Sequence, residues 1–125
     1  DLPIAYSFSY ASKVLNDVEL MNYSNSILKL SKHKELTSSH LKYFEAYDFF
    51  DVGFCHGISS ILFFFYKLNI LHNDELLNFK IDYWRKELIK NTDKLISSLE
   101  VFISITGSIQ LIVTLSQIID SPLFT

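Results

Sequence analysis

The sequence has little cysteine, glycine or proline, and each shortage excludes a class of protein. Cys55 is the only cysteine, so no internal disulfide can form, and a secreted disulfide-stapled scaffold is excluded. We expect a reducing, cytoplasmic location instead. Three glycines and two prolines are too few for a β-rich or loop-rich fold, because tight turns draw heavily on both residues.

Charge and hydrophobicity argue against two binding partners. The chain carries 11 basic and 14 acidic side chains, a net charge of -3, so it lacks the basic surface that nucleic acid requires. The longest apolar runs, residues 58–71 and 105–119, contain polar residues and fall short of the ~20 that span a bilayer. The chain opens on Asp1 without a signal pattern, so we expect it to be a piece of a longer protein.

The apolar residues, 49% of the 125, suffice for one packed domain over residues 1–125 without an internal boundary. Their spacing predicts an all-α fold with five helices: residues 3–15, about 18–32, 54–69, one that follows the caps at 73–75, and 104–120. Between them, residues 33–51 are predicted to form a loop with a short helix near 41–47.

The same spacing predicts which residues are buried. The first helix is expected to bury Ile4, Ala5, Phe8, Ala11, Val14 and Leu15, and the fourth Leu77, Ile81, Trp84 and Leu88. The third is apolar all round, which indicates burial on every side. Three of the four histidines, His33, His40 and His72, lie among polar residues and are expected to face solvent.

A repeat underlies this order of helices. Asn16-Asp17 and Asn73-Asp74 each end an apolar helix, and each is followed by a similar text that begins at Glu19 and at Glu75. The second of these glutamates lies 56 residues after the first. Each repeat is predicted to be a buried helix followed by an amphipathic one. Units of this kind stack on one another, side by side or around a ring, because none buries its apolar face alone.

The side chains most able to bind a metal or react are those of Cys55 and His56, which lie side by side between Gly53 and Gly57 at the start of an apolar segment. Thiolate and imidazole are preferred ligands of zinc, whereas a lone cysteine beside an apolar helix is otherwise inert core. Both interpretations are open at this point. Asp48 and Asp51 precede the pair, either as partners that orient His56 or as solvated carboxylates.

Three segments resemble one family. Residues 54–61, Phe-Cys-His-Gly-Ile-Ser-Ser-Ile, resemble the Cys-His-Gly-x-x-Gly-Ile segment of the lanthionine synthetase C-like proteins, the cyclases of lanthipeptide (lantibiotic) biosynthesis. Residues 1–6 with 15–17 resemble the family's Trp-Cys-Tyr-Gly-Asp-x-Gly-Ile-Ala segment from its Asp onward. Residues 99–116 and 121–124 resemble its last helix and tail, so the likeness covers the whole chain in order.

The resemblance implies an α/α toroid, a ring of helical hairpins of which this chain would be the C-terminal part. It also implies a zinc ion held by two cysteines and a histidine, with Cys55 and His56 as two of the ligands and the third expected just before Asp1. Such bacterial enzymes add cysteine thiols to dehydroalanine or dehydrobutyrine, which forms thioether rings. The implied partners are a dehydrated precursor peptide and a lanthipeptide dehydratase. No catalytic acid or base can be transferred to this chain.

Departures from the family pattern keep an alternative open. The second glycine of the Gly-x-x-Gly pattern is replaced by Pro3 in the first repeat and by Ser60 in the second, and the family's long loop is shortened to about residues 91–104. The chain alone, with two of three ligands, is expected to be inactive. The alternative is a degenerate or truncated relative, a non-catalytic helical-repeat module that binds peptides.

Overall fold

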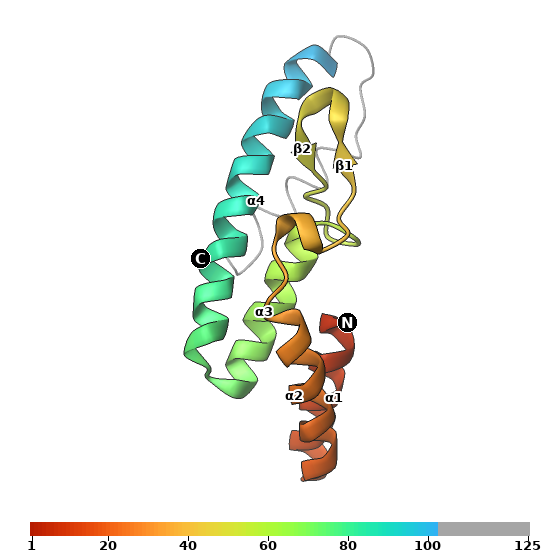
Figure 1. Ribbon diagram of the computed structural model, residues 1–125, viewed down its shortest axis with the longest axis vertical. Coiled ribbons are helices and arrows are strands. Elements are labelled where there is room, and N and C mark those ends of the chain that lie inside the picture. Colours follow the sequence, from red (N-terminus) through yellow and green to blue (C-terminus); the bar gives the residue numbers. More distant parts are fainter. Residues whose placement is uncertain (103–125) are drawn as a thin grey trace. The chain divides into compact units, whose positions relative to one another are not determined.

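The computed structural model describes the backbone of residues 1–102 and the side chains of residues 1–99 (Figure 1). Four α-helices dominate these residues, in the order α1 (Leu2–Leu15), α2 (Val18–Ser31), α3 (Ile58–His72) and α4 (Glu75–Phe102). The predicted all-α class is therefore confirmed. The helix predicted at 104–120 and the family-like tail lie outside the described residues.

The contacts between Cα atoms divide the chain into two compact units. The first consists of Asp1–His40 and Ile61–Arg85, and the second of Leu41–Ser60 with the part of α4 that begins at Lys86. None of the helices in the described part of the chain is long and apolar enough to cross a membrane.

In the first unit, α1 and α2 lie side by side as a helical hairpin (Figure 1). The helix α1 ends at Asn16, whose φ of 54° is left-handed, a conformation that asparagine tolerates better than most residues. Asp17 then caps α2, because its Oδ1 accepts hydrogen bonds from the amides of Glu19 (2.8 Å) and Leu20 (3.3 Å). Asparagine and aspartate thus end one helix and start the next within two residues.

The corner between α3 and α4 has the same local geometry. Asn73 is left-handed, with a φ of 51°, and Asp74 Oδ1 accepts a hydrogen bond of 2.8 Å from the Leu76 amide. Asp74 also forms an ion pair with Lys32 of the first hairpin. The two Asn-Asp pairs that the sequence repeats therefore perform the same two jobs, a left-handed helix end followed by a side-chain cap.

The contact between α1 and α2 is lined by small polar residues, which the sequence did not predict. The buried residues of α1 are Leu2, Ala5, Ser9 and Ser12, and those of α2 are Ser24, Leu28 and Ser31. Three residues expected in the core, Ile4, Val14 and Leu15, are 52%, 66% and 68% exposed. That prediction was wrong because hydrogen-bonded serines can take core positions that an apolar stripe would assign to larger side chains.

Most of the large apolar core residues of the first unit come from α3 and α4. Leu62, Phe65 and Leu68 of α3 are buried, as are Leu77, Ile81 and Trp84 of α4, which confirms the stripe predicted for the fourth helix. Burial of α3 on every side was wrong, since Tyr66 is 38% and Ile70 60% exposed. The buried residues of α3 recur every three residues, so one face packs inward.

The second unit contains residues 41–51 of the stretch 33–51 that was predicted to be a loop. Here two short strands, β1 (Tyr43–Phe44) and β2 (Phe49–Phe50), pair antiparallel around the 3-10 turn η2 (Glu45–Tyr47). A further 3-10 turn, η1 (Leu36–Ser38), belongs to the first unit. The loop predicted over 91–104 was wrong as far as Phe102, because α4 continues through it without a glycine or proline to break the helix.

Candidate functional site

The candidate site is the turn between β2 and α3, residues 51–57, which presents Cys55 and His56. Helix α3 begins at Ile58 and not at residue 54, so the pair lies in the turn before the helix. Cys55 and His56 are both solvent-exposed, as is Phe54 beside them. The sequence predicted the two residues as neighbours of a helix start, and the structure puts them within reach of a ligand from solvent.

The turn is closed by backbone hydrogen bonds across its base. The Gly57 amide donates to the Gly53 carbonyl (3.0 Å), and the Ile58 amide donates to the Asp51 carbonyl (2.8 Å). The hydroxyl of Ser59 donates to the Val52 carbonyl at 2.6 Å. These bonds tie both ends of the turn to the first residues of α3.

Gly57 is the residue that allows so tight a closure. A Cβ atom at this position would lie 2.4 Å from the Gly53 nitrogen, 2.5 Å from the Asp51 oxygen and 2.6 Å from the Gly53 oxygen. All three are backbone atoms, which cannot move aside without opening the turn. The glycine of the Cys-His-Gly segment is therefore required by close backbone contact.

Two ligand side chains on one closed turn match the donor types that zinc prefers. They make an incomplete set, since zinc sites with protein ligands use at least three. Within residues 1–99, whose side chains are described, no cluster of three or more histidine, cysteine, aspartate and glutamate side chains is arranged to hold a metal. The pair can therefore supply two ligands, and a third would have to come from outside these residues.

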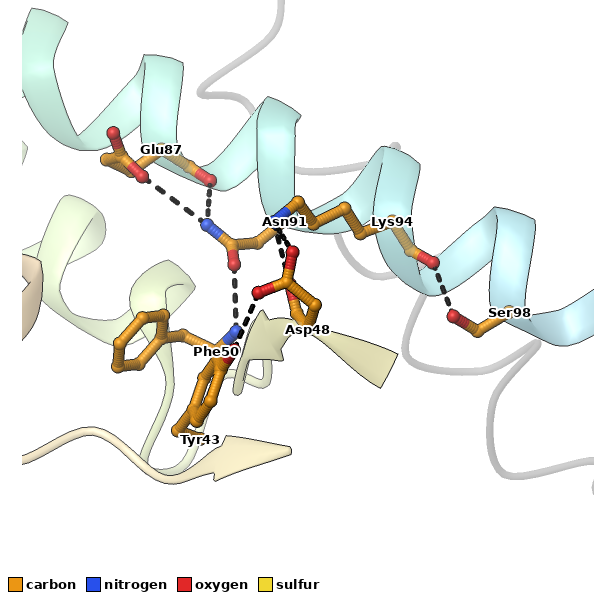
Figure 2. A network of polar contacts seen from close by, with 7 residues as sticks. All are labelled: Tyr43, Asp48, Phe50, Glu87, Asn91, Lys94 and Ser98. Atoms are coloured by element: carbon orange, nitrogen blue, oxygen red, sulfur yellow. Dashed lines mark hydrogen bonds and ion pairs between the residues drawn. The ribbon is translucent and has the colours of Figure 1, made fainter. Parts of the chain in front are cut away.

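The sequence left two roles open for Asp48 and Asp51, partners that orient His56 or solvated carboxylates. Both have partners other than His56, and Figure 2 shows those of Asp48. Asp48 accepts a hydrogen bond of 2.6 Å from the Tyr43 hydroxyl, and its other carboxylate oxygen lies 2.6 Å from the Lys94 ammonium. Asp51 Oδ1 accepts a hydrogen bond of 2.7 Å from the Gly53 amide. Among the described residues neither carboxylate hydrogen-bonds His56, and Asp51 instead organises the turn that carries it.

The hydrogen bonds of Asp48 change its own pKa and that of Tyr43. The hydrogen bond from Lys94 and then that from Tyr43 lower the pKa of Asp48, so its carboxylate stays ionised. The same bond to Asp48 raises the pKa of the Tyr43 phenol, which therefore stays protonated. Both groups are at the surface, so the pair fixes geometry and contributes little free energy.

Helix α4 holds β2 in place through Asn91 (Figure 2). The buried Asn91 side chain accepts a hydrogen bond of 2.8 Å from the Phe50 amide and donates one of 2.8 Å to the Glu87 carbonyl. The Asp51 amide in turn donates to the Lys42 carbonyl at 2.8 Å, beside the start of β1. A continuous set of hydrogen bonds thus runs from α4 through the strands to the turn of Cys55 and His56.

A second polar cluster, in the first unit, was missed by the sequence analysis. His72 was expected to face solvent, but it is half-buried, and its Nε2 lies 2.7 Å from Ser9 Oγ. Ser9 Oγ is 2.5 Å from Ser24 Oγ, which donates to the Ala5 carbonyl at 2.7 Å. No local signal marks this contact, because Ser9 and His72 are 63 residues apart.

The direction of these bonds follows from counting protons. A hydroxyl has one proton, and Ser24 uses its own on Ala5, so Ser9 must donate to Ser24. His72 Nε2 must then donate to Ser9. A serine nucleophile needs the reverse, a histidine that accepts its proton, and Ser9 is 0% exposed. The cluster is therefore structural and not a hydrolytic site.

Burial, followed by the charges of Lys32 and Lys13, lowers the pKa of His72, while Asp74 opposes the shift. The neutral imidazole with its proton on Nε2 is thus favoured in the folded protein.

Comparisons of this chain with protein-family models, with curated proteins and with solved structures find no match.

Proposed function

We propose that this chain contributes Cys55 and His56 to the zinc site of a lanthionine synthetase C-like enzyme, which closes thioether rings in a dehydrated precursor peptide. The observation that carries the proposal is the closed turn between Gly53 and Gly57, which holds a thiol and an imidazole side by side in solvent. An inert core cysteine would be buried, and this one is exposed.

The fold lends a second support. The α1–α2 hairpin and the α3–α4 corner share an asparagine in the left-handed conformation and an aspartate cap. Repeats of one local unit are what a ring of helical hairpins requires. We extend the proposal to the architecture: the two hairpins are consecutive units of an α/α toroid.

The residues of this chain have defined tasks in this proposal. Cys55 and His56 would hold the ion, and the turn would fix their spacing before the metal arrives. When bound, zinc supplies the positive charge that stabilises a substrate cysteine as its thiolate, the form that attacks a dehydroamino acid. Helix α3 begins at residue 58, so the pair lies just before the N-terminus of the helix, where a peptide could reach it.

Metal content of the natural protein at full length is the direct test. We expect about one zinc per molecule by elemental analysis, as for a site with three protein ligands. Cys55→Ser and His56→Gln should each remove most of it, and His33→Gln, a change at an exposed histidine of the first unit, should not. A folded wild-type protein without zinc would refute the proposal.

Activity separates the proposal from a non-catalytic relative. The cyclase is expected to convert a dehydrated precursor peptide into a product of equal mass with fewer free thiols, measured by thiol alkylation and mass spectrometry. A chelator should abolish this conversion. Peptide binding that survives chelation, without loss of thiols, would instead favour the peptide-binding module.

A further inference from the structure

Asp51, the first residue of the turn, hydrogen-bonds through its side chain to the backbone inside the turn. Its Oδ1 accepts a hydrogen bond of 2.7 Å from the Gly53 amide, which makes a short ring of side chain and backbone across Val52. Its own carbonyl accepts from Ile58, and its amide donates to Lys42. One residue thus joins the strand before the turn, the turn itself and the helix after it.

The packing around this residue leaves no slack. A Cβ atom on Gly53 would lie 2.9 Å from Asp51 Oδ1, and one on Gly57 would lie 2.5 Å from the Asp51 carbonyl oxygen. A side chain at either glycine position would therefore collide with Asp51. Val52, between Asp51 and Gly53 in the chain, is 4% exposed and anchors the segment in the core. We call these contacts of Asp51 with the Lys42, Gly53 and Ile58 backbone the clamp. It sets the positions of Cys55 and His56, because the chain between Gly53 and Gly57 has only three residues.

We propose that Asp51 is the positioning residue of the Cys55–His56 pair, and that it acts on metal affinity through its bond to the Gly53 amide. The inference rests on the proposed zinc site. It differs from the role that the sequence suggested, in which the carboxylate would contact His56 itself. The bond needs an acceptor oxygen at residue 51 and not a negative charge, and this requirement makes the role testable.

A pair of substitutions isolates the acceptor. Asp51→Asn keeps an Oδ1 that can accept from the Gly53 amide, whereas Asp51→Ala removes it. Asp48→Asn is the matched control, because it removes the charge of the other flanking aspartate, whose partners are Tyr43 and Lys94. Each variant is made in the natural protein at full length.

Zinc affinity is measured by competition with a chromophoric chelator, and the thiolate-to-metal absorption of the cobalt form reports on Cys55. Loss of a residue that orients metal ligands weakens affinity by about 10–100-fold, and we expect this range for Asp51→Ala. Asp51→Asn and Asp48→Asn should bind as the wild type does. An Asp51→Ala protein with wild-type affinity, or an Asp51→Asn protein as weak as Asp51→Ala, would overturn the proposal.

Hydrogen exchange of the Gly53 amide separates this inference from the function on which it rests. The amide should be protected in the wild type and in Asp51→Asn, and lose protection in Asp51→Ala. If that pattern appears in a wild type that binds no zinc, the zinc site is refuted and the clamp stands. If protection is equal in all three proteins, the clamp is refuted whatever the metal content.

Discussion

Replacement of Gly57 by alanine tests the closure of the turn most directly. The new Cβ would lie 2.4–2.6 Å from three backbone atoms, closer than real Cβ atoms approach. The turn must therefore open, and the bonds from Gly57 to Gly53 and from Ile58 to Asp51 are lost. Each hydrogen bond contributes about 0.5–1.5 kcal/mol, so we expect a loss of about 1–3 kcal/mol in the free energy of unfolding.

The matched control is Gly53→Ala. Its Cβ would meet only Asp51 Oδ1, at 2.9 Å, and that side chain can rotate away at the loss of one hydrogen bond. We expect a smaller loss, about 1 kcal/mol. Urea unfolding of both variants gives the comparison, and hydrogen exchange of the Ile58 amide shows whether the turn has opened. The reasoning fails if Gly57→Ala is as stable as the wild type, or no less stable than Gly53→Ala.

Three further predictions concern stability. The folded pKa of His72 is below its usual 6.5, mainly through burial, so its contribution to stability is full above pH 6.5 and falls as the pH drops toward the folded pKa. The urea midpoint of His72→Gln should therefore change less between pH 7.5 and 5.5 than that of the wild type, and an equal change would contradict this. Asn91→Ala leaves the Phe50 amide without its acceptor and should cost about 1–3 kcal/mol; a urea midpoint equal to that of the wild type would refute that role. Asp17→Ala removes a helix cap and should cost about 0.5–2 kcal/mol by thermal unfolding, less than Asp74→Ala, which also loses an ion pair; the reverse order would count against it.

The helices were predictable because their apolar residues recur with the period of a helix, and the corners because Asn-Asp is a strong end-and-cap signal. The faces were less so. Ser9 and Ser24 can be buried because their hydroxyls are hydrogen-bonded to each other and to the Ala5 carbonyl. The spacing of apolar residues along the sequence does not reveal a hydrogen bond between two distant side chains. The exposed Val14 and Leu15 are the counterpart of that choice.

The candidate site shows the same division. Cys55 and His56 were predicted as ligands from their residue types and from the family resemblance, and their exposure on a turn agrees with a site that a ligand can reach. The partner of Asp48 is Lys94 of α4, 46 residues away, which no local pattern indicates, and the partner of Asp51 is the nearby Gly53 amide. Asp48 occupies a left-handed turn position where the sequence offers no glycine, so the usual hairpin signal was absent.

The serine-lined contact between α1 and α2 fixes the register in which the two helices of the hairpin pack. Apolar side chains slide past one another at small loss, but the relay from His72 through Ser9 and Ser24 to the Ala5 carbonyl closes in a single register. A shift of either helix by one turn would leave buried hydroxyls without partners. The hairpin therefore gains a single alignment of its two helices at the expense of apolar burial, and replacement of one of these serines by an apolar residue would leave its partner unpaired and weaken the preference for that alignment.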